Sequence, residues 1–98
     1  MRAPGYWVAH VAIHDVAGYA AYRAAAAPAI TAGGGRIRVL SDSGETVAGQ
    51  SRPHSVLVEF PSLEAARAWY FGPAYQATIP ARDAAADVDL IIVEGRAP

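Results

Sequence analysis

The segment Tyr6–His14 reads Tyr-Trp-Val-Ala-His-Val-Ala-Ile-His, and the interpretation of the whole chain starts from it. It is rich in strand-forming residues and contains neither glycine nor proline, so it predicts a β-strand. Alternate side chains of a strand point to opposite faces. Here the odd-numbered positions are all apolar, whereas the even-numbered positions mix aromatic, apolar and histidine side chains. Neither set is typical of a solvent-facing surface, which indicates that both sides of this strand are covered.

A helix is predicted directly after this strand. Asp15 is a candidate N-cap, because its carboxylate can accept the free amides of a first helical turn. The apolar spacing over 16–32 is helical, and Pro28 is expected to kink or split that helix because proline lacks an amide donor. The run Gly33-Gly34-Gly35 ends the helix, with one glycine in the left-handed conformation.

The rest of the chain predicts two more strands, a second helical region and a last strand. Ser62 is a candidate helix cap, Gly72-Pro73 is a break, and Pro80 is expected to disturb the helix that follows it. The predicted elements are a strand over 36–40, a turn over 41–44, a short strand over 45–48, a strand over 55–60, helices over 63–71 and 73–86, and a strand over 88–94.

This β-α-β-β-α-β order predicts an α+β protein with the ferredoxin-like fold. Two βαβ halves form a four-stranded antiparallel sheet with the helices on one face. A chain of 98 residues without internal repeats or linkers fits one domain, residues 1–98.

The sheet face opposite the helices is predicted to be too apolar for open solvent. A chain this short, without cysteine, also has a thin core and no disulfide to stabilise it. We therefore expect a homodimer that packs two such faces together. By strand alternation, the predicted face carries Tyr6, Val8, His10 and Ala12, then Arg38 and Leu40, then Leu57 and Glu59, and finally Leu90 and Ile92.

Composition excludes several classes of partner. The formal net charge of −1 argues against a nucleic-acid or anionic-membrane surface, because both need clustered cationic residues.

All eight basic residues are arginine and 23 residues are alanine, which is typical of a high-GC bacterial source. Residues 1–5 contain no apolar signal-peptide run, and the apolar segment Leu90–Val93 is too short to cross a bilayer. We expect a cytoplasmic protein.

Seven segments occur in an order that resembles the domain of unknown function 1330 family over nearly the whole chain. The resemblance implies a ferredoxin-like fold of the dimeric α/β-barrel superfamily, which includes cofactor-independent monooxygenases, isomerases, cyclases and ligand-binding proteins. The family itself has no established reaction. The chain departs from it at Leu40–Asp42, Ser51 and Ala74, so several polar positions that would suit a shared site are missing. The matching segments are Gly5–Ala9, Gly34–Arg36, Val58–Ala66, Ala68–Tyr70, Pro73–Gln76, Arg82 with Ala84–Asp87, and Val93–Gly95.

The usual catalytic and metal-binding signatures are absent from the sequence. Without cysteine there is no thiol nucleophile and no cysteine-ligated zinc. His10 and His14 share a face of one strand but lie about 13 Å apart along it, so one metal ion cannot bind both directly. We expect neither a metal nor a cofactor.

Three residues on the face opposite the helices are the candidate catalytic groups. His10 can act as an acid or base near neutral pH, or can be a buried neutral histidine bonded to a neighbour. Arg38 and Glu59 can form a structural ion pair. Alternatively, they can bind a carboxylate or enolate ligand, with Glu59 as base and Arg38 as charge stabiliser.

Aromatic residues provide candidate substrate-binding groups. Trp69, Tyr70 and Tyr75 can wall a cleft between helix and sheet, or can be core residues instead. The hydroxyls of Tyr6 and Tyr75 can orient a small ligand. Arg82 and Asp87 are expected to be solvated helix charges.

Two functions remain open on the sequence. The first is a cofactor-independent enzyme of isomerase, cyclase or monooxygenase type that acts on a small organic substrate. The second is a non-catalytic module of the same fold, which binds a small ligand or mediates an interaction.

Overall fold

The computed structural model describes residues 3–98 and contains the predicted order of main strands and helices. Met1 and Arg2, which belong to the segment considered for a signal peptide, lie outside the described residues. The elements are β1 (Gly5–Ile13), α1 (Val16–Ala32), β2 (Arg36–Ser41), β3 (His54–Phe60), α2 (Leu63–Phe71), α3 (Pro73–Gln76), α4 (Ile79–Ala85) and β4 (Ala86–Glu94).

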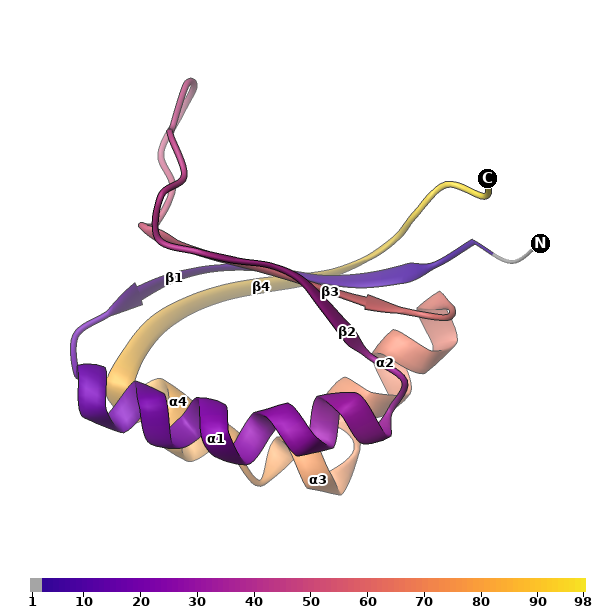
Figure 1. Cartoon of the computed structure of the whole chain (residues 1–98), viewed down its shortest axis with the longest axis horizontal. Coiled ribbons are helices and arrows are strands. Elements are labelled where there is room, and N and C mark those ends of the chain that lie inside the picture. The colour runs from indigo at the N-terminus through magenta and orange to yellow at the C-terminus, as the bar shows by residue number, and fades with distance from the viewer. Residues whose placement is uncertain (1–2) are drawn as a thin grey trace.

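The four strands form one sheet in the order β2-β3-β1-β4, and each neighbouring pair is antiparallel. The helices lie together on one side of the sheet (Figure 1). Strand β1 is central and pairs with both β3 and β4. This is the ferredoxin-like α+β architecture that the sequence predicts. The other side of the sheet, called the open face below, has no covering layer among residues 3–98.

The predicted caps are confirmed. The Asp15 side chain accepts a hydrogen bond of 3.0 Å from the amide of Gly18 at the start of α1. At its other end Gly34 has φ of 81°, the left-handed conformation that glycine adopts without steric cost. The Ser62 hydroxyl accepts from the amide of Ala65 at 3.1 Å and begins α2.

The helix-breaking effects of proline were predicted only in part. Pro28 lies inside a single α1, so the predicted split is wrong. Pro28 and Ala24, whose carbonyl loses its helical donor, are both exposed, and water can bond that carbonyl. The second helical region is broken, but the break falls at residues 77–78, and Pro80 stands in the first turn of α4, where proline is tolerated.

No strand forms over 45–48, contrary to the prediction. These residues belong to an arm, residues 42–53, which rises from the sheet on the side away from the helices (Figure 1). Within the arm, the hydroxyls of Thr46 and Ser51 lie 2.5 Å apart. The segment has strand-forming residues but no neighbouring strand with which to pair.

The register between strands corrects the predicted face of β4. Trp7 pairs with Ile92 and Ala9 pairs with Leu90, so Leu90 and Ile92 face the helices and not the open side. Directly paired residues of antiparallel strands share a face, and a shift of one residue reverses it. The open face carries Asp89, Ile91 and Val93 from β4 instead.

A β-bulge corrects the predicted face of β2. The register shifts between Ile37 and Val39, which inserts one extra residue at Arg38. As a result Ile37 and Leu40 both face the helices, opposite Val58 and Val56 of β3. Val39 lies on the open face, so strict alternation placed Leu40 and Val39 on the wrong sides.

The core is centred on Trp7 in the middle of the sheet. Its ring lies 4.8 Å from the ring of Phe60 and 4.7 Å from that of Tyr75, measured between centroids. Its indole nitrogen donates a hydrogen bond of 2.8 Å to the carbonyl oxygen of Ala66 in α2. Trp7 therefore joins the sheet to α2 and α3.

Candidate functional site

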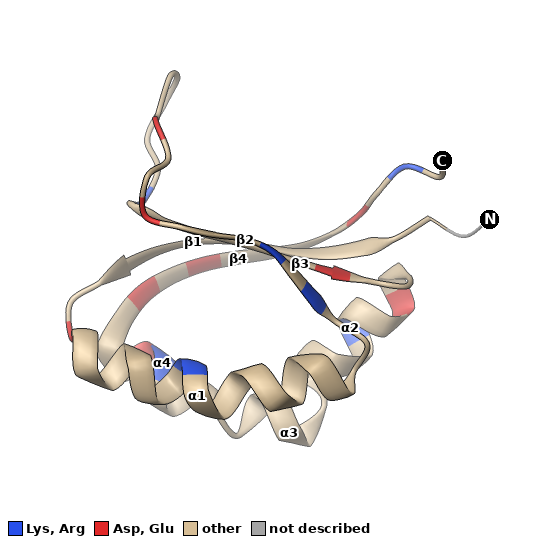
Figure 2. Cartoon of the chain, in the orientation of Figure 1, with Lys and Arg blue, Asp and Glu red and all other residues tan. Residues whose placement is uncertain are grey.

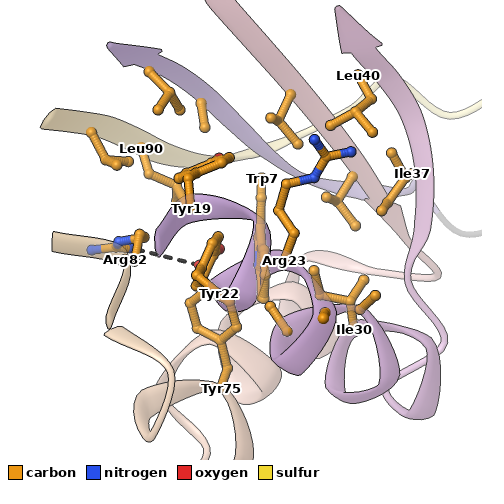
Figure 3. Close-up of a pocket in the computed structure, with 18 of the residues that line it drawn as sticks. Trp7, Tyr19, Tyr22, Arg23, Ile30, Ile37, Leu40, Tyr75, Arg82 and Leu90 are labelled. Carbon is orange, nitrogen blue, oxygen red and sulfur yellow. Dashed lines mark hydrogen bonds between the residues drawn. The ribbon is translucent and has the colours of Figure 1, made fainter. Parts of the chain in front are cut away.

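An apolar cavity of about 380 Å³ lies between α1 and the helix-facing side of the sheet (Figure 3). Nine of the 17 residues of α1 are alanine. Alanine has too little side-chain volume to fill the space between a helix and a sheet, which leaves a void in a region that is otherwise packed closely. The walls are formed mainly by Trp7, Val58 and Leu90 of the sheet and by Ala26, Ala27 and Ile30 of α1.

One end of the cavity is closed by a chain of hydrogen-bonded polar groups. The hydroxyl oxygens of Tyr22 and Tyr75 lie 2.6 Å apart. The Nη1 atom of Arg82 donates to the hydroxyls of Tyr75 and Tyr70, each at 3.3 Å, and Figure 3 shows it directed toward the tyrosines. The Nε atom of Arg82 donates to Asp83 at 3.0 Å. This network, defined as the Arg82 cluster, joins α1, α2, α3 and α4.

Burial fixes the charge states of the Arg82 cluster. Burial raises the pKa of Tyr22 far above its ordinary value of 10.0, and the adjacent Tyr75 raises it further, so Tyr22 stays protonated at neutral pH. Burial alone would lower the pKa of Arg82, but its hydrogen bonds to Tyr70, Asp83 and Tyr75 raise it above the ordinary arginine value. The cluster therefore presents neutral hydroxyls beside a permanent positive charge.

The arrangement suits a small apolar molecule with one oxygen atom. Either the Tyr22 or the Tyr75 hydroxyl can donate to that oxygen, because the other proton is used in the bond between them, and Arg82 can stabilise negative charge on it. Arg23, also from the cavity wall, extends from α1 toward the sheet and adds a second cation (Figure 3). Among residues 3–98, no Asp, Glu or His side chain lines this cavity.

The predicted substrate-binding residues are not brought together. Tyr75 lines the cavity and is only 1% exposed. Trp69 is partly buried, and a side chain at Gly33 would collide with its ring, so it packs against the end of α1. Tyr6 pairs with Glu59 and Val93 and lies on the open face.

The predicted catalytic residues lie on the open face, and only two of them meet. Arg38 Nε lies 3.1 Å from Glu59 Oε1, as one of the predicted alternatives states. His10 pairs with Ser55, four residues along β1 from the position opposite Glu59, which corresponds to about 13 Å. His10 instead borders shallow depressions beside Arg52. A catalytic role for the three residues stays a prediction.

Sequence reasoning missed most of the Arg82 cluster. Arg82 is not a solvated helix charge as predicted; it is 8% exposed, because three helices close around it and tyrosine hydroxyls accept its hydrogen bonds. Asp87 is exposed as predicted, but it stands on β4 and lies 3.8 Å from Arg52. The only local signal for the cluster was the recurrence of tyrosine in the helical segments.

His54 was also missed. It is 3% exposed, and its Nδ1 atom lies 2.6 Å from Asp42 Oδ1. Its sequence context, between Pro53 and the strand, resembles a loop end, and its burial follows only from its pairing with Val11 of the central strand.

In Figure 2, the arginine and acidic residues of the described part of the chain are spread over strands, helices and the arm. In residues 3–98, no three His, Cys, Asp or Glu side chains gather in a way that could hold a metal ion. Over the same residues, every helix is too short or too polar to cross a membrane.

The fold and the site define a small ferredoxin-like α+β protein with an apolar cavity beneath its first helix. The chain belongs to the domain of unknown function 1330 family, whose model matches residues 4–96. A search of curated proteins finds no match to this chain.

Solved structures share the fold at low sequence identity. A protein of unknown function from Rhodopseudomonas palustris has a TM-score of 0.78 at 21% identity, with 100% of this chain and 86% of that chain covered. SnoaB, a cofactor-independent oxygenase from Streptomyces nogalater, has a TM-score of 0.70 at 14% identity, with coverages of 98% and 96%. A dimeric ferredoxin-like protein of unknown function from Bacteroides fragilis has a TM-score of 0.54 at 13% identity, with coverages of 93% and 95%.

The raised pKa of Tyr22 predicts instability at high pH. Above pH 10 the unfolded chain loses the Tyr22 proton while the folded chain keeps it, so the free energy of unfolding falls as pH rises. The substitution Tyr22→Phe should make this fall shallower by about 1.4 kcal/mol per pH unit. Urea unfolding of both proteins between pH 8 and pH 11 measures how steeply the free energy of unfolding falls with pH. At neutral pH the variant should lose only about 1 kcal/mol, from the missing hydrogen bond. Equal slopes for both proteins would contradict the assignment.

Proposed function

We propose that this chain is a cofactor-independent enzyme that binds a small, largely apolar organic molecule in the cavity between α1 and the sheet. The observation that carries the proposal is the apolar cavity of about 380 Å³ that ends at the Arg82 cluster. Its size lies within the range of small-molecule sites, which combine apolar walls with a few convergent polar groups. The structural similarity to a cofactor-independent oxygenase supports a reaction that needs no cofactor.

The Arg82 cluster supplies electrostatic stabilisation in this proposal. A carbonyl oxygen of the substrate accepts a hydrogen bond from Tyr22 or Tyr75, with the Arg82 guanidinium behind them. When the substrate becomes an enolate, the negative charge develops on that oxygen, where fixed donors in an apolar cavity act most strongly. Isomerase, cyclase and monooxygenase reactions that begin by forming such an anion are all compatible with this arrangement.

The second candidate is a non-catalytic small-ligand-binding module. One observation favours it: in the described part of the chain, the cavity wall contains no carboxylate or imidazole that could remove a proton. Both candidates share the same binding site, and they differ only in whether a base reaches the bound molecule.

Filling the cavity should abolish binding. Ala25 and Ala27 are both exposed residues of α1, but only Ala27 lines the cavity. We expect 2-naphthol, a flat molecule with one hydroxyl, to bind, and Ala27→Phe to raise its dissociation constant at least tenfold. The matched control Ala25→Phe should stay within twofold. Isothermal titration calorimetry measures both, and equal weakening by the two variants would rule out this cavity as the site.

We also propose that the open face joins a second copy of this chain. Among residues 3–98 nothing covers the apolar side chains of this face, including Ile91 at 59% exposure and Val93 at 37%. Charged groups near its two edges are already paired within the chain: Arg38 lies 3.1 Å from Glu59 beside β2, and Arg52 lies 2.8 Å from Asp89 of β4. A two-fold axis parallel to the strands places β2 of one copy over β4 of the other and packs the two apolar faces together.

A charge placed in the open face should prevent this association. Ile91→Glu buries an unpaired carboxylate in the proposed interface, which is costly. We expect the unmodified protein to sediment as a dimer at micromolar concentration and Ile91→Glu to sediment as a monomer. Phe71→Glu is the matched control, because Phe71 is equally exposed but belongs to α2. Analytical ultracentrifugation tests this, and a monomeric unmodified chain would refute the proposal.

A further inference from the structure

A second polar feature on the helix side of the sheet is a buried histidine held by an acid. His54 begins β3 and pairs with Val11 of β1, so it shares the face that lines the main cavity. Its Nδ1 atom lies 2.6 Å from Asp42 Oδ1, and the Asp42 side chain is otherwise 81% exposed. The contact joins the two ends of the 42–53 arm.

The other ring nitrogen of His54 has no partner. Among the described residues, His54 Nε2 is the buried side-chain nitrogen or oxygen atom that lacks a hydrogen bond. Because an ionised carboxylate only accepts hydrogen bonds, Asp42 requires the proton of the neutral imidazole to be on Nδ1. Nε2 then carries a free lone pair. A buried acceptor without a donor is rare and calls for an explanation.

The position of His54 relative to the main cavity suggests an explanation for the unpaired Nε2 atom. A second cavity of about 420 Å³, lined by His54 and Asp42, shares Val11, Tyr19 and Arg23 with the main cavity. The ring of Tyr19 lies 5.8 Å from the His54 ring and 5.2 Å from the Tyr22 ring. A molecule held against Tyr22 therefore lies next to the ring that packs against His54.

We propose that His54, oriented by Asp42, is the base that removes a proton from the molecule bound in the main cavity. This inference rests on the proposed function and supplies the group that the main cavity lacks. An imidazole whose second nitrogen is fixed by a carboxylate is a common arrangement for a general base. Nε2 is covered in this structure, so the transfer requires the Tyr19 ring, which packs 5.8 Å from the His54 ring, to move aside.

The substrate class that fits is a small ketone with an acidic C–H bond next to its carbonyl group. The C–H bond breaks, and its proton moves to His54 Nε2. Its electron pair forms a carbon–carbon double bond, while the carbonyl pair moves to oxygen and gives an enolate. Tyr22 or Tyr75, whichever does not donate to the other, donates to that oxygen, beside Arg82. Return of the proton from Nε2 to the enolate oxygen gives the enol isomer, whereas its return to carbon restores the ketone; no oxidant or co-reactant is consumed.

The tautomer of His54 gives a test that needs no substrate. Long-range ¹H–¹⁵N correlation spectra of the unmodified protein should show the His54 proton on Nδ1 and none on Nε2. In Asp42→Ala the two tautomers should mix. A proton on Nε2 in the unmodified protein would overturn the proposal.

The role of His54 as the base is tested with 2-tetralone, a flat bicyclic ketone with acidic C–H bonds. In D₂O, the unmodified protein should accelerate exchange of these hydrogens for deuterium, as followed by ¹H NMR. His54→Gln should lower the accelerated rate at least a hundredfold and leave the dissociation constant within twofold. Asp42→Asn should lower the rate less. His14→Gln is the matched control, because His14 is exposed just after the end of β1 and lines neither cavity, and it should exchange at the unmodified rate.

The failures of the two proposals are distinguishable. If 2-tetralone does not bind in calorimetry, or if Ala27→Phe leaves its binding unchanged, the proposed function fails and the inference fails with it. If 2-tetralone binds in the main cavity but exchange is not accelerated, or if His54→Gln exchanges at the unmodified rate, the binding proposal stands. In that case His54 is not the base.

Discussion

The hydrogen-bond chain from Arg82 through Tyr75 to Tyr22 holds the helices in place, and the shape of the site depends on it. A buried guanidinium must find acceptors, and it finds them on tyrosines from α2 and α3, while Tyr22 brings in α1. The alanine side chains of α1 cannot fill the remaining distance to the sheet. The same contacts that stabilise the helical layer therefore keep a cavity open beneath it.

The two faces of the sheet have separate roles in this account. The helix side contains the cavity, the Arg82 cluster and the buried His54 with its partner Asp42. The open face contains exposed apolar side chains, which suit a second copy better than a small ligand. The exposed Arg38–Glu59 pair on that face contributes little to stability on its own, because solvent screens it.

The sequence predicted those features that local physical chemistry determines. Asp15, Ser62 and Gly34 act within one turn of the chain, so their effects on helix ends were visible. The face of Leu90 depends on the register between β1 and β4, and that of Leu40 depends on a bulge, neither of which alternation reveals. Of the residues that line the candidate cavity, only Tyr75 was among the predicted site residues. Arg82 and His54 become functional candidates through contacts between distant segments, which a single sequence does not display.

The central claim is that small molecules bind on the helix side of the sheet, between α1 and the central strands. Intermolecular nuclear Overhauser effects between 2-naphthol and methyl-labelled protein test it most directly. The account predicts contacts from the ligand to the methyl groups of Val58 and Leu90, which line the cavity. Contacts confined to Ile91 and Val93 on the open face would contradict it.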